Sequence, residues 1–563
     1  MKKLRHLLIS AIFAIFLLVF PYIIQAETIV AKENSPGKTD NSVESFKRES
    51  KENLVNMDII EQLFIQSGDD QEKFELLLSG CDFTNIEFSQ LYSFLSRPVN
   101  IPEKYLNKAP NLEIRKLKCS DNIERPFIVG IPSINGTESF PLIIFLHGGV
   151  SWEEKNGEHL MEEAEENVFW KHAKEKKCFF LYPFAQDGAT WWDKRGMENI
   201  SRQIKILKKD FNIDDKRVWL GGVSDGGSGT FIQAMLKPQD YAACFSLIGH
   251  PGLGNIEGGL PTYLTNLSNI PSFVINTTDD NFYPSSRMIK ILEVAKKCGA
   301  DILFRELPGG HDTNFLLQES LKIIDFLESN VRNNFPSRIN FETSDLDYGK
   351  FLWLKIESLD PFQRKDWHKE NNAILPDEKV EMRWIIESDF SKGGASIKRI
   401  FIDTIPSALG LRSGDIIQKI DEVQITSKQV FDEIISKLRR GRDIQLDILR
   451  DGKSEKILSR FPQPVWKYVF QYDSPSGIVH AECIGNKIEL KSSGVASLSI
   501  FVHPDQFDIS RKISVYSSGE QVFNDYVYPD KSFMLRNFFR NYDKSLIYIN
   551  KISLQIKSKP EPF

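Results

Sequence analysis

The sequence predicts an α/β protein built on a doubly wound, mostly parallel sheet, followed by an all-β region. Between residues 110 and 335, short β-type runs alternate with amphipathic helical segments. The runs are apolar enough to be covered on both faces, as in parallel sheets. After Pro336 the alternation stops and short β-type runs continue. The predicted strands of the first part are 126–131, 141–146, 178–182, 217–221, 243–249, 271–276 and 301–307, and its predicted helices are 153–175, 196–210, 225–237, 284–298 and 313–333.

Length and composition indicate a globular chain of several domains. At roughly 150 residues per domain, 563 residues predict about three to four domains. The 71 Lys and Arg and 77 Asp and Glu sum to a net charge of −6. Without a long basic run after the N-terminus, this charge predicts no nucleic-acid partner. The six Cys include no C-x-x-C pair, which excludes a zinc site of that spacing.

The first 26 residues are typical of a secretory signal peptide. A positively charged start precedes an apolar stretch, 7–24, and Ala26 offers a small residue at a cleavage point. We therefore expect a secreted or periplasmic protein, in an oxidising compartment where cysteines can pair. The sequence does not choose a pairing. The alternative is an uncleaved anchor, because the apolar stretch reaches the lower limit of a membrane span. Membrane contact is expected only in that case.

Two short regions separate this segment from the first predicted strand. Residues 27–53 are polar and charged, which predicts a flexible tether. Residues 54–109 place apolar side chains such as Ile59, Leu63 and Phe74 at helical spacing. We expect a small helical prelude there, with a packing role.

The strongest chemical signal is Gly222-Val223-Ser224-Asp225-Gly226, which follows the predicted strand 217–221 and opens a helix. A strand-to-helix turn this tight strains the serine, and side chains two residues to either side would collide. The helix N-terminus behind Ser224 presents its positive dipole end to a developing oxyanion. This pattern indicates a nucleophilic serine.

Three further candidate residues or motifs each come directly or shortly after a predicted strand. His147-Gly148-Gly149 follows 141–146, Asp280 follows 271–276, and His311 follows 301–307. Catalytic groups of open α/β sheets gather at the carboxyl ends of the strands. The order Ser, Asp, His is that of α/β-hydrolases. We expect Ser224 as nucleophile, His311 as general base and Asp280 as its orienting acid. The neighbouring Asp279 is the less favoured acid.

Other residues at this edge are predicted to bind the substrate. The amides of Gly149 and Asp225 are the expected oxyanion donors. His147 and His250 each directly follow a predicted strand and are expected to line the substrate pocket. His250 precedes the acid in the chain, which disfavours it as the catalytic base.

Residues 110–335, the α/β-hydrolase catalytic domain, resemble secreted α/β-hydrolases of the esterase/depolymerase and prolyl-oligopeptidase-like group. Tyr182-Pro183, Trp191-Trp192-Asp193, Arg217-Val218 and Gly222 to Gly227 carry the resemblance. It implies acyl transfer to water without deciding between ester and peptide. It also implies that Trp191 and Trp192 border the active site and contact substrate. The alternative for both is a packed loop, since buried Trp is common.

Residues 378–463 resemble a PDZ domain of the bacterial envelope-protease kind. Ile405-Pro406-Ser407-Ala408, Ser413 to Ile417 and Arg450-Asp451-Gly452 carry the resemblance, and 427–438 is its expected helix. It implies binding of a peptide or a protein C-terminus. Glu422 departs from the family because it replaces the customary Gly. The sequence shows no clear carboxylate-binding loop, and Gly393-Gly394 is a weak candidate. A spacer or docking surface is therefore the alternative.

The remaining C-terminal segments, 336–377 and 464–563, resemble the accessory β domain of this hydrolase group, interrupted by the PDZ-like block. Its predicted strands include 351–356, 486–491, 497–502, 512–516 and 546–556. We assign it no site, because His480 and His503 lack partners at metal spacing. No metal or cofactor is expected anywhere in the chain.

The sequence thus predicts a secreted serine hydrolase that cleaves carboxylic esters through an acyl-enzyme on Ser224. One alternative is a serine peptidase of prolyl-oligopeptidase type. Such peptidases usually carry an N-terminal β-propeller, and residues 27–110 are too few to form one. The other alternative is a PDZ-based binding protein with a vestigial hydrolase domain.

Overall fold

The computed structural model describes residues 56–150, 157–378, 380, 382–387, 390–401 and 404–556. The predicted signal peptide, 1–26, and the predicted tether, 27–53, lie outside the described residues. The chain forms two compact units: a smaller one up to Leu95 together with Lys531–Arg540, and a larger one of Ser96–Asp530 with the residues from Asn541 onward. Within the described ranges, no helix is both long enough and apolar enough to cross a membrane.

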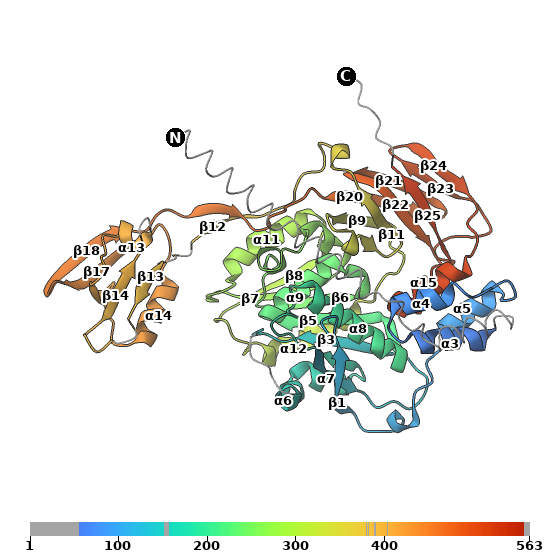
Figure 1. The fold of residues 1–563 in the computed structure, drawn as a ribbon, viewed down its shortest axis with the longest axis horizontal. Coiled ribbons are helices and arrows are strands. Elements are labelled where there is room, and N and C mark those ends of the chain that lie inside the picture. Colours follow the sequence, from blue (N-terminus) through green and yellow to red (C-terminus); the bar gives the residue numbers. More distant parts are fainter. Residues whose placement is uncertain are drawn as a thin grey trace, which may run out of the picture. The chain divides into compact units, whose positions relative to one another are not determined.

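An eight-stranded sheet lies at the centre of the larger unit (Figure 1). Its order is β1-β2-β4-β3-β5-β6-β7-β8. Strands β3 to β8 run parallel, whereas β1 and β2 are antiparallel to their neighbours. The strands are β1 Asn111–Lys118, β2 Glu124–Ile131, β3 Phe140–Leu146, β4 Phe179–Tyr182, β5 Ile213–Val223, β6 Ala243–Leu247, β7 Ser272–Thr277 and β8 Ile302–Leu307. This arrangement confirms the predicted α/β fold.

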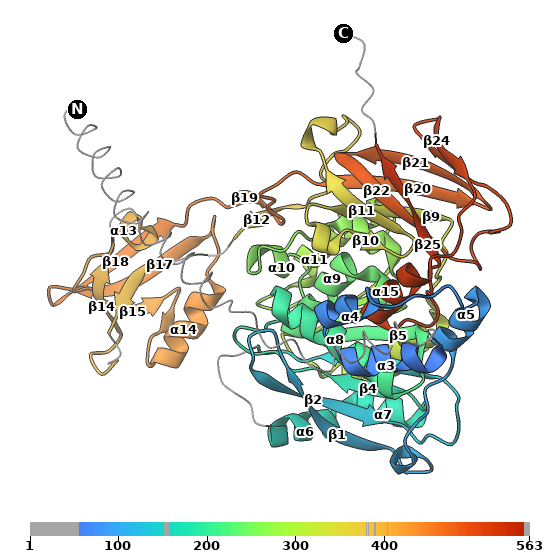
Figure 2. The same cartoon turned by 45° about the vertical axis from the view of Figure 1, so that its right-hand side comes forward.

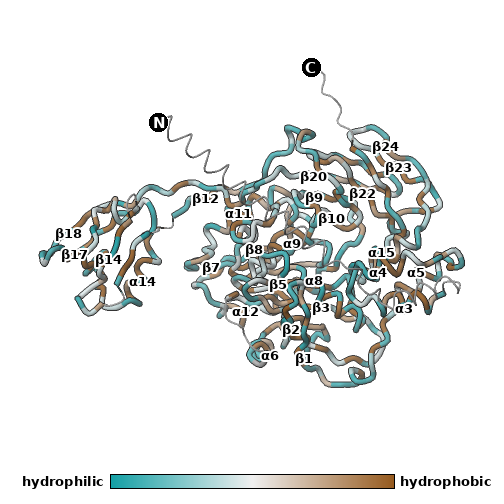
Figure 3. The backbone as a smooth tube through the Cα atoms, in the orientation of Figure 1, coloured by the Kyte–Doolittle hydropathy of each residue, from teal (hydrophilic) through white to brown (hydrophobic). Residues whose placement is uncertain are grey.

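Helices cover both faces of this sheet, and the strands bury apolar side chains on both faces. Figure 3 shows hydrophobic segments of the chain, in brown, around these strands. In β3, Leu142 and Ile144 pack into one core, and Ile143 and Phe145 pack into the other. Side chains of α8, α9 and α11 fill the first core, and those of α6, α7 and α12 fill the second. The helices are α6 Gly157–Glu166, α7 Val168–Glu175, α8 Lys194–Asp210, α9 Asp225–Leu236, α10 Leu253–Ile256, α11 Ser285–Lys297 and α12 Leu316–Ser329. The sheet is therefore doubly wound, as predicted.

Two local differences from the predicted elements have clear causes. Strand β1 was not predicted, because it is an edge strand that leaves most of its side chains partly or fully exposed. The helix predicted over 153–175 is divided at Asn167, whose side chain accepts a hydrogen bond from the Phe169 amide at 2.9 Å and starts α7 there.

Two sheets form the accessory β region (Figure 2). The ring of Phe341, in the five-stranded sheet, stacks on that of Phe351, in the four-stranded sheet, with 6.1 Å between ring centroids. The five-stranded sheet, in spatial order, contains β24 Glu520–Asp525, β23 Ile513–Ser517, β21 Lys487–Ser493, β20 Gly477–Ile484 and β9 Arg338–Thr343. The four-stranded sheet contains β10 Lys350–Phe351, β11 Leu354–Leu359, β22 Val495–Val502 and β25 Asn550–Gln555.

A two-stranded ribbon of β12 Ile374–Asp377 and β19 Val465–Tyr468 interrupts this β region. Asp377 pairs directly with Val465, so the 87 residues between them leave and re-enter at one point. They form a separate sheet with its own core and a helix, α14 Lys428–Lys437. The sheet contains β13 Trp384–Ile386, β14 Ala395–Ile400, β15 Ile416–Ile420, β16 Val423–Gln424, β17 Asp443–Arg450 and β18 Lys453–Arg460, and α13 Ile405–Ala408 precedes β15. This block is an insertion, as the sequence predicts.

Helices build the smaller unit. They are α3 Met57–Ser67, α4 Gln71–Leu78, α5 Phe88–Ser96 and α15 Lys531–Asn541. The rings of Phe74 and Phe539 stack at 3.9 Å, and Arg536 pairs with Glu75 at 2.7 Å. Helix α15 belongs to a segment that the sequence analysis assigned to the accessory β domain, so the helical unit is assembled from both ends of the chain.

Candidate active site

Ser224 lies at the junction of β5 and α9 with the backbone angles φ 55° and ψ −115°. A non-glycine residue at positive φ is strained and needs support from its surroundings. The Ser224 amide donates to Leu247 O at 2.9 Å. A Cβ on Gly222 would lie 2.4 Å from Gly226 O, and one on Gly226 would lie 2.0 Å from Leu146 O. The two glycines are therefore required for the turn to pack against β3.

The structure brings Ser224, His311 and Asp280 into one hydrogen-bonded chain. Ser224 Oγ lies 2.7 Å from His311 Nε2, and His311 Nδ1 lies 2.8 Å from Asp280 Oδ2. The other carboxylate oxygen of Asp280 accepts the amides of Phe282 and Tyr283 at 2.7 and 2.9 Å. Each of the three residues follows the carboxyl end of a parallel strand: β5, β7 and β8.

Electrostatics keep Asp280 ionised. Burial of its side chain alone would raise the pKa of this carboxyl group, but the hydrogen bonds from His311 and from the Tyr283 and Phe282 amides outweigh burial and lower the pKa. A carboxylate at Nδ1 holds the proton of neutral His311 on that nitrogen. His311 Nε2 is then the acceptor that faces the Ser224 hydroxyl.

The loop after β3 lies against Ser224. A Cβ on Gly148 would lie 3.1 Å from Ser224 Cβ, and Gly149 has a φ of +62°. The Val150 amide donates to Asp225 Oδ2 at 2.9 Å. The Asp225 carboxylate therefore ties this loop to the first turn of α9. The two amides predicted to hold an oxyanion, those of Gly149 and Asp225, belong to the segments that this hydrogen bond joins.

His147 and Trp191 support that loop from the interior. The sequence predicted that both side chains contact substrate. Their exposed fractions are only 3% and 1%, so neither lies at a surface where it could meet substrate directly. The Trp191 indole donates to His147 O at 2.9 Å. His147 Nε2 accepts the Ala185 amide at 3.1 Å, and Nδ1 lies 2.8 Å from Gly148 O. Trp192 is partly buried and packs against two apolar clusters.

Aromatic side chains that the sequence analysis did not single out lie beside His311. The ring of Phe282 is 69% exposed, and its centroid is 4.8 Å from that of the imidazole. Tyr283 lies between His311 and His250, at centroid distances of 5.9 and 5.5 Å. The local signal was an aromatic pair directly after the acid loop. Together the rings of Phe282 and Tyr283 form an apolar rim next to His311.

His250 lies beside Tyr283 at this rim. Its Nδ1 accepts the Gly252 amide at 3.1 Å, and its own amide donates to Ser228 Oγ at 2.9 Å. Burial, together with the positive charge of Arg287, lowers the pKa of His250 to about 4. His250 is therefore a neutral imidazole at neutral pH.

The ribbon of β12 and β19, which carries the insertion, lies next to the rim that contains Tyr283 and His250. A Cβ on Gly252 would lie 2.8 Å from Val469 Cγ1 and 2.9 Å from His250 Cε1. Arg287 donates to Pro376 O at 3.1 Å, and Asn255 exchanges two hydrogen bonds with the backbone of Gln471. The ribbon that carries the insertion is thus fixed to the loops around His250. These contacts could not be predicted from the sequence, because they join segments 89 to more than 200 positions apart.

Among the residues that the structure describes, no group of three or more His, Cys, Asp or Glu side chains could hold a metal ion. His480 packs against the Trp367 ring, and His503 Nδ1 accepts the Asp505 amide at 3.1 Å.

Comparisons with known proteins bear on both parts of the larger unit. Residues 400–458 match the family model described as a PDZ domain. A bifunctional acetylxylan esterase/xylanase of Neocallimastix patriciarum is 28% identical over 172 residues, which cover 30% of this chain and 23% of that protein. The chain thus spans less than a quarter of the length of this curated relative.

Solved structures with a similar part include a thermostable esterase and a fluorophosphonate-binding serine hydrolase of Staphylococcus aureus. The esterase is 21% identical with a TM-score of 0.33, over 39% of this chain and 63% of its own. The staphylococcal protein is 14% identical with a TM-score of 0.33, over 39% of this chain and 99% of its own. A putative dipeptidyl aminopeptidase IV of Bacteroides ovatus is 14% identical with a TM-score of 0.34, over 39% of this chain and 36% of its own. The strand order of the eight-stranded sheet is that of the α/β-hydrolase fold. The family match places a PDZ domain in the C-terminal β-rich region.

Proposed function

We propose that this protein is a serine hydrolase that cleaves carboxylic esters through an acyl-enzyme intermediate. The observation that carries the proposal is the hydrogen-bonded chain from Ser224 Oγ through His311 to Asp280, with the serine on a strained turn at a helix N-terminus. A serine hydroxyl is a weak nucleophile until a base accepts its proton, and His311 Nε2 is positioned to do so.

In the first half of the reaction, Ser224 Oγ attacks the ester carbonyl carbon while its proton moves to His311 Nε2. The carbonyl oxygen becomes an oxyanion, which the amides of Gly149 and Asp225 stabilise. Asp280 stabilises the imidazolium. The tetrahedral intermediate expels the alcohol, whose oxygen takes the proton from His311, and the acyl group stays on Ser224. Water then attacks the acyl-enzyme, loses its proton to His311, and releases the carboxylic acid as Ser224 regains that proton.

One observation favours an ester over a peptide substrate. The curated relative is named a bifunctional acetylxylan esterase/xylanase. A peptidase remains the second candidate, because the same triad can also cleave amides.

Location and recruitment complete the proposal. The signal-peptide pattern of residues 1–26 supports a secreted or periplasmic enzyme. The PDZ match supports a role for the insertion in binding a peptide or a protein C-terminus, and the ribbon that carries it is fixed beside His250. Tethering would raise the local concentration of a captured substrate near Ser224.

The proposal is tested with p-nitrophenyl esters of increasing acyl length and with matched p-nitroanilides of short peptides. We expect turnover of the esters, dependent on Ser224, with little turnover of the anilides. The control is Glu257→Ala, which changes an exposed carboxylate near the same edge and should retain full activity. Faster turnover of the anilides would favour the peptidase. An inactive but folded wild-type chain would favour the PDZ-based binding protein.

A further inference from the structure

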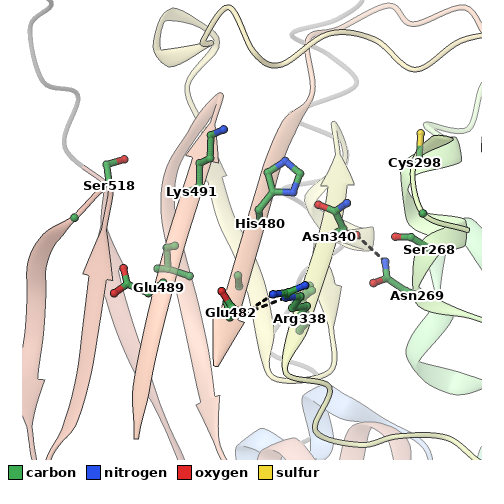
Figure 4. A pocket seen from close by; sticks show the side chains of 15 residues that line it. Ser268, Asn269, Cys298, Arg338, Asn340, His480, Glu482, Glu489, Lys491 and Ser518 are labelled. Carbon is green, nitrogen blue, oxygen red and sulfur yellow. Dashed lines mark hydrogen bonds and ion pairs between the residues drawn. The ribbon is translucent and has the colours of Figure 1, made fainter. Parts of the chain in front are cut away.

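A hollow lies in the larger unit, between the five-stranded sheet and the hydrolase domain (Figure 4). Its volume is about 730 Å³, within the range of small-molecule clefts. The outer face of β9, β20 and β21 forms its floor. Ser268 and Asn269, with Gly299 after α11, form one wall, and the Ser518-Gly519 turn lies at the other side. None of these residues belongs to the site around Ser224.

The strand register orders the floor into two rows of polar side chains. His480 pairs with Asn340 on one side and with Lys491 on the other. Glu482 pairs in the same way with Arg338 and Glu489. Directly paired residues point to the same face of a sheet. The floor of the hollow therefore presents an amide, an imidazole, an ammonium, a guanidinium and two carboxylate groups.

The charges of this floor cancel. Arg338 donates to Glu482 through Nε and Nη2 at 3.0 and 2.9 Å. Glu489 pairs with Lys487 at 2.8 Å, and Lys491 Nζ lies 4.3 Å from the centroid of the Trp367 ring. A balanced surface of this kind does not concentrate ligands of either charge. The polar floor equally disfavours an acyl chain, and an added peptide strand would need a free strand edge rather than a face.

Neutral hydrogen-bonding capacity remains on this floor. The side-chain oxygen of Asn340 is buried, and no described residue donates to it. A buried acceptor without a donor is unfavourable, so a donor from a ligand would stabilise it. His480 packs against Trp367, with 5.0 Å between ring centroids, and burial with the nearby Lys491 lowers its pKa. A neutral imidazole offers one donor and one acceptor, which complements a ligand hydroxyl.

From this geometry we infer that the hollow is a binding site for a neutral saccharide chain. Hydroxyl groups donate and accept at once, so they match a floor that mixes amide, imidazole, guanidinium and carboxylate groups. The expected contacts run along the row of Asn340, His480 and Lys491. The site would hold a glycan on the accessory β region, apart from the chemistry at Ser224, and the inference does not depend on that chemistry.

The test is calorimetric titration of the full chain, carrying Ser224→Ala to prevent turnover, with neutral hexasaccharides of glucose, xylose, mannose and N-acetylglucosamine. We expect one of them to bind with a Kd of about 10 μM to 1 mM. Asn340→Ala should weaken that binding at least about tenfold, as expected for one lost hydrogen bond in a desolvated site. His480→Phe keeps a ring against Trp367, removes both nitrogens, and should have a similar effect.

The matched control is Gln521→Ala, on the exposed edge strand β24, which should bind like the parent chain. In chains with Ser224 intact, Asn340→Ala and His480→Phe should leave the hydrolysis of p-nitrophenyl acetate unchanged, which separates this site from the proposed function. No binding up to about 10 mM would overturn the inference. So would a preference for a polyanion such as heparin, or binding that both substitutions leave intact.

Discussion

The hydrogen bond from the Val150 amide to Asp225 Oδ2 makes a sharp prediction, because it ties the side chain of the first residue of α9 to the loop after β3 that carries Gly149. Asp225→Ala removes the acceptor and leaves the Asp225 amide in place. A hydrogen bond to a charged group contributes about 1.5–3 kcal/mol. If the loop loses its position for the oxyanion, the same free energy is lost from the transition state. The rate should then fall by about 10- to 150-fold.

The loss should appear in kcat with little change in KM, because the oxyanion forms only in the transition state. Asp225→Asn keeps an acceptor oxygen without the charge and should lose only about fivefold. The assay is steady-state hydrolysis of p-nitrophenyl acetate, with thermal unfolding as a check on folding. The control is Glu257→Ala. A folded Asp225→Ala chain with kcat within twofold of wild type would refute the reasoning, as would a change confined to KM.

Three further predictions follow from the same geometry. Replacing residues 378–464 by Asn-Gly joins the paired Asp377 and Val465 through a two-residue turn. The shortened chain should hydrolyse p-nitrophenyl acetate at a rate within about twofold of wild type but should lose binding to peptides with free C-termini. Equal losses of hydrolysis and of peptide binding would contradict a recruiting role for the insertion. A Cβ on Gly226 would lie 2.0 Å from Leu146 O and 2.7 Å from His147 O, so Gly226→Ala should lower the free energy of unfolding by about 1–3 kcal/mol or more, and an unchanged melting temperature would show that the turn can relax. His250 takes up a proton near pH 6.5 when unfolded but near pH 4 when folded, so protons favour the unfolded chain and stability falls as the pH drops from 6.5 to 4. The side chain of His250→Asn can still accept a hydrogen bond from the Gly252 amide, so this variant should lose less stability than wild type between pH 6.5 and 4, by at most about 3 kcal/mol. An equal fall in the free energy of unfolding of the two chains over this pH range, measured by urea titration, would disprove this.

The turn that holds Ser224 could be predicted because its signals are local. Gly222 and Gly226 flank Ser224 at positions where any side chain would meet the backbone of β3 or of the turn itself. Asp280 and His311 could be placed because parallel strands end at one edge of the sheet, so strand ends that are far apart in sequence are close in space.

The supporting contacts could not be predicted in this way. Trp191 is as compatible with a pocket wall as with a core, and only the three-dimensional packing shows its indole donating to His147 O. The contact of Val469 with the loop of His250 depends on how the β region docks onto the sheet. Helix α15 packs with α4 through Phe539 and Phe74, across more than 400 positions of sequence.

The most direct test of the central claim is labelling of the full chain with a fluorophosphonate, followed by mass spectrometry of the labelled peptide. The account predicts a single adduct on Ser224, lost in Ser224→Ala and much slower to form in His311→Ala, where the hydroxyl has no base. Both variants should unfold at temperatures close to that of wild type. A folded wild-type chain that takes up no label, or that is labelled on another serine, would contradict the account.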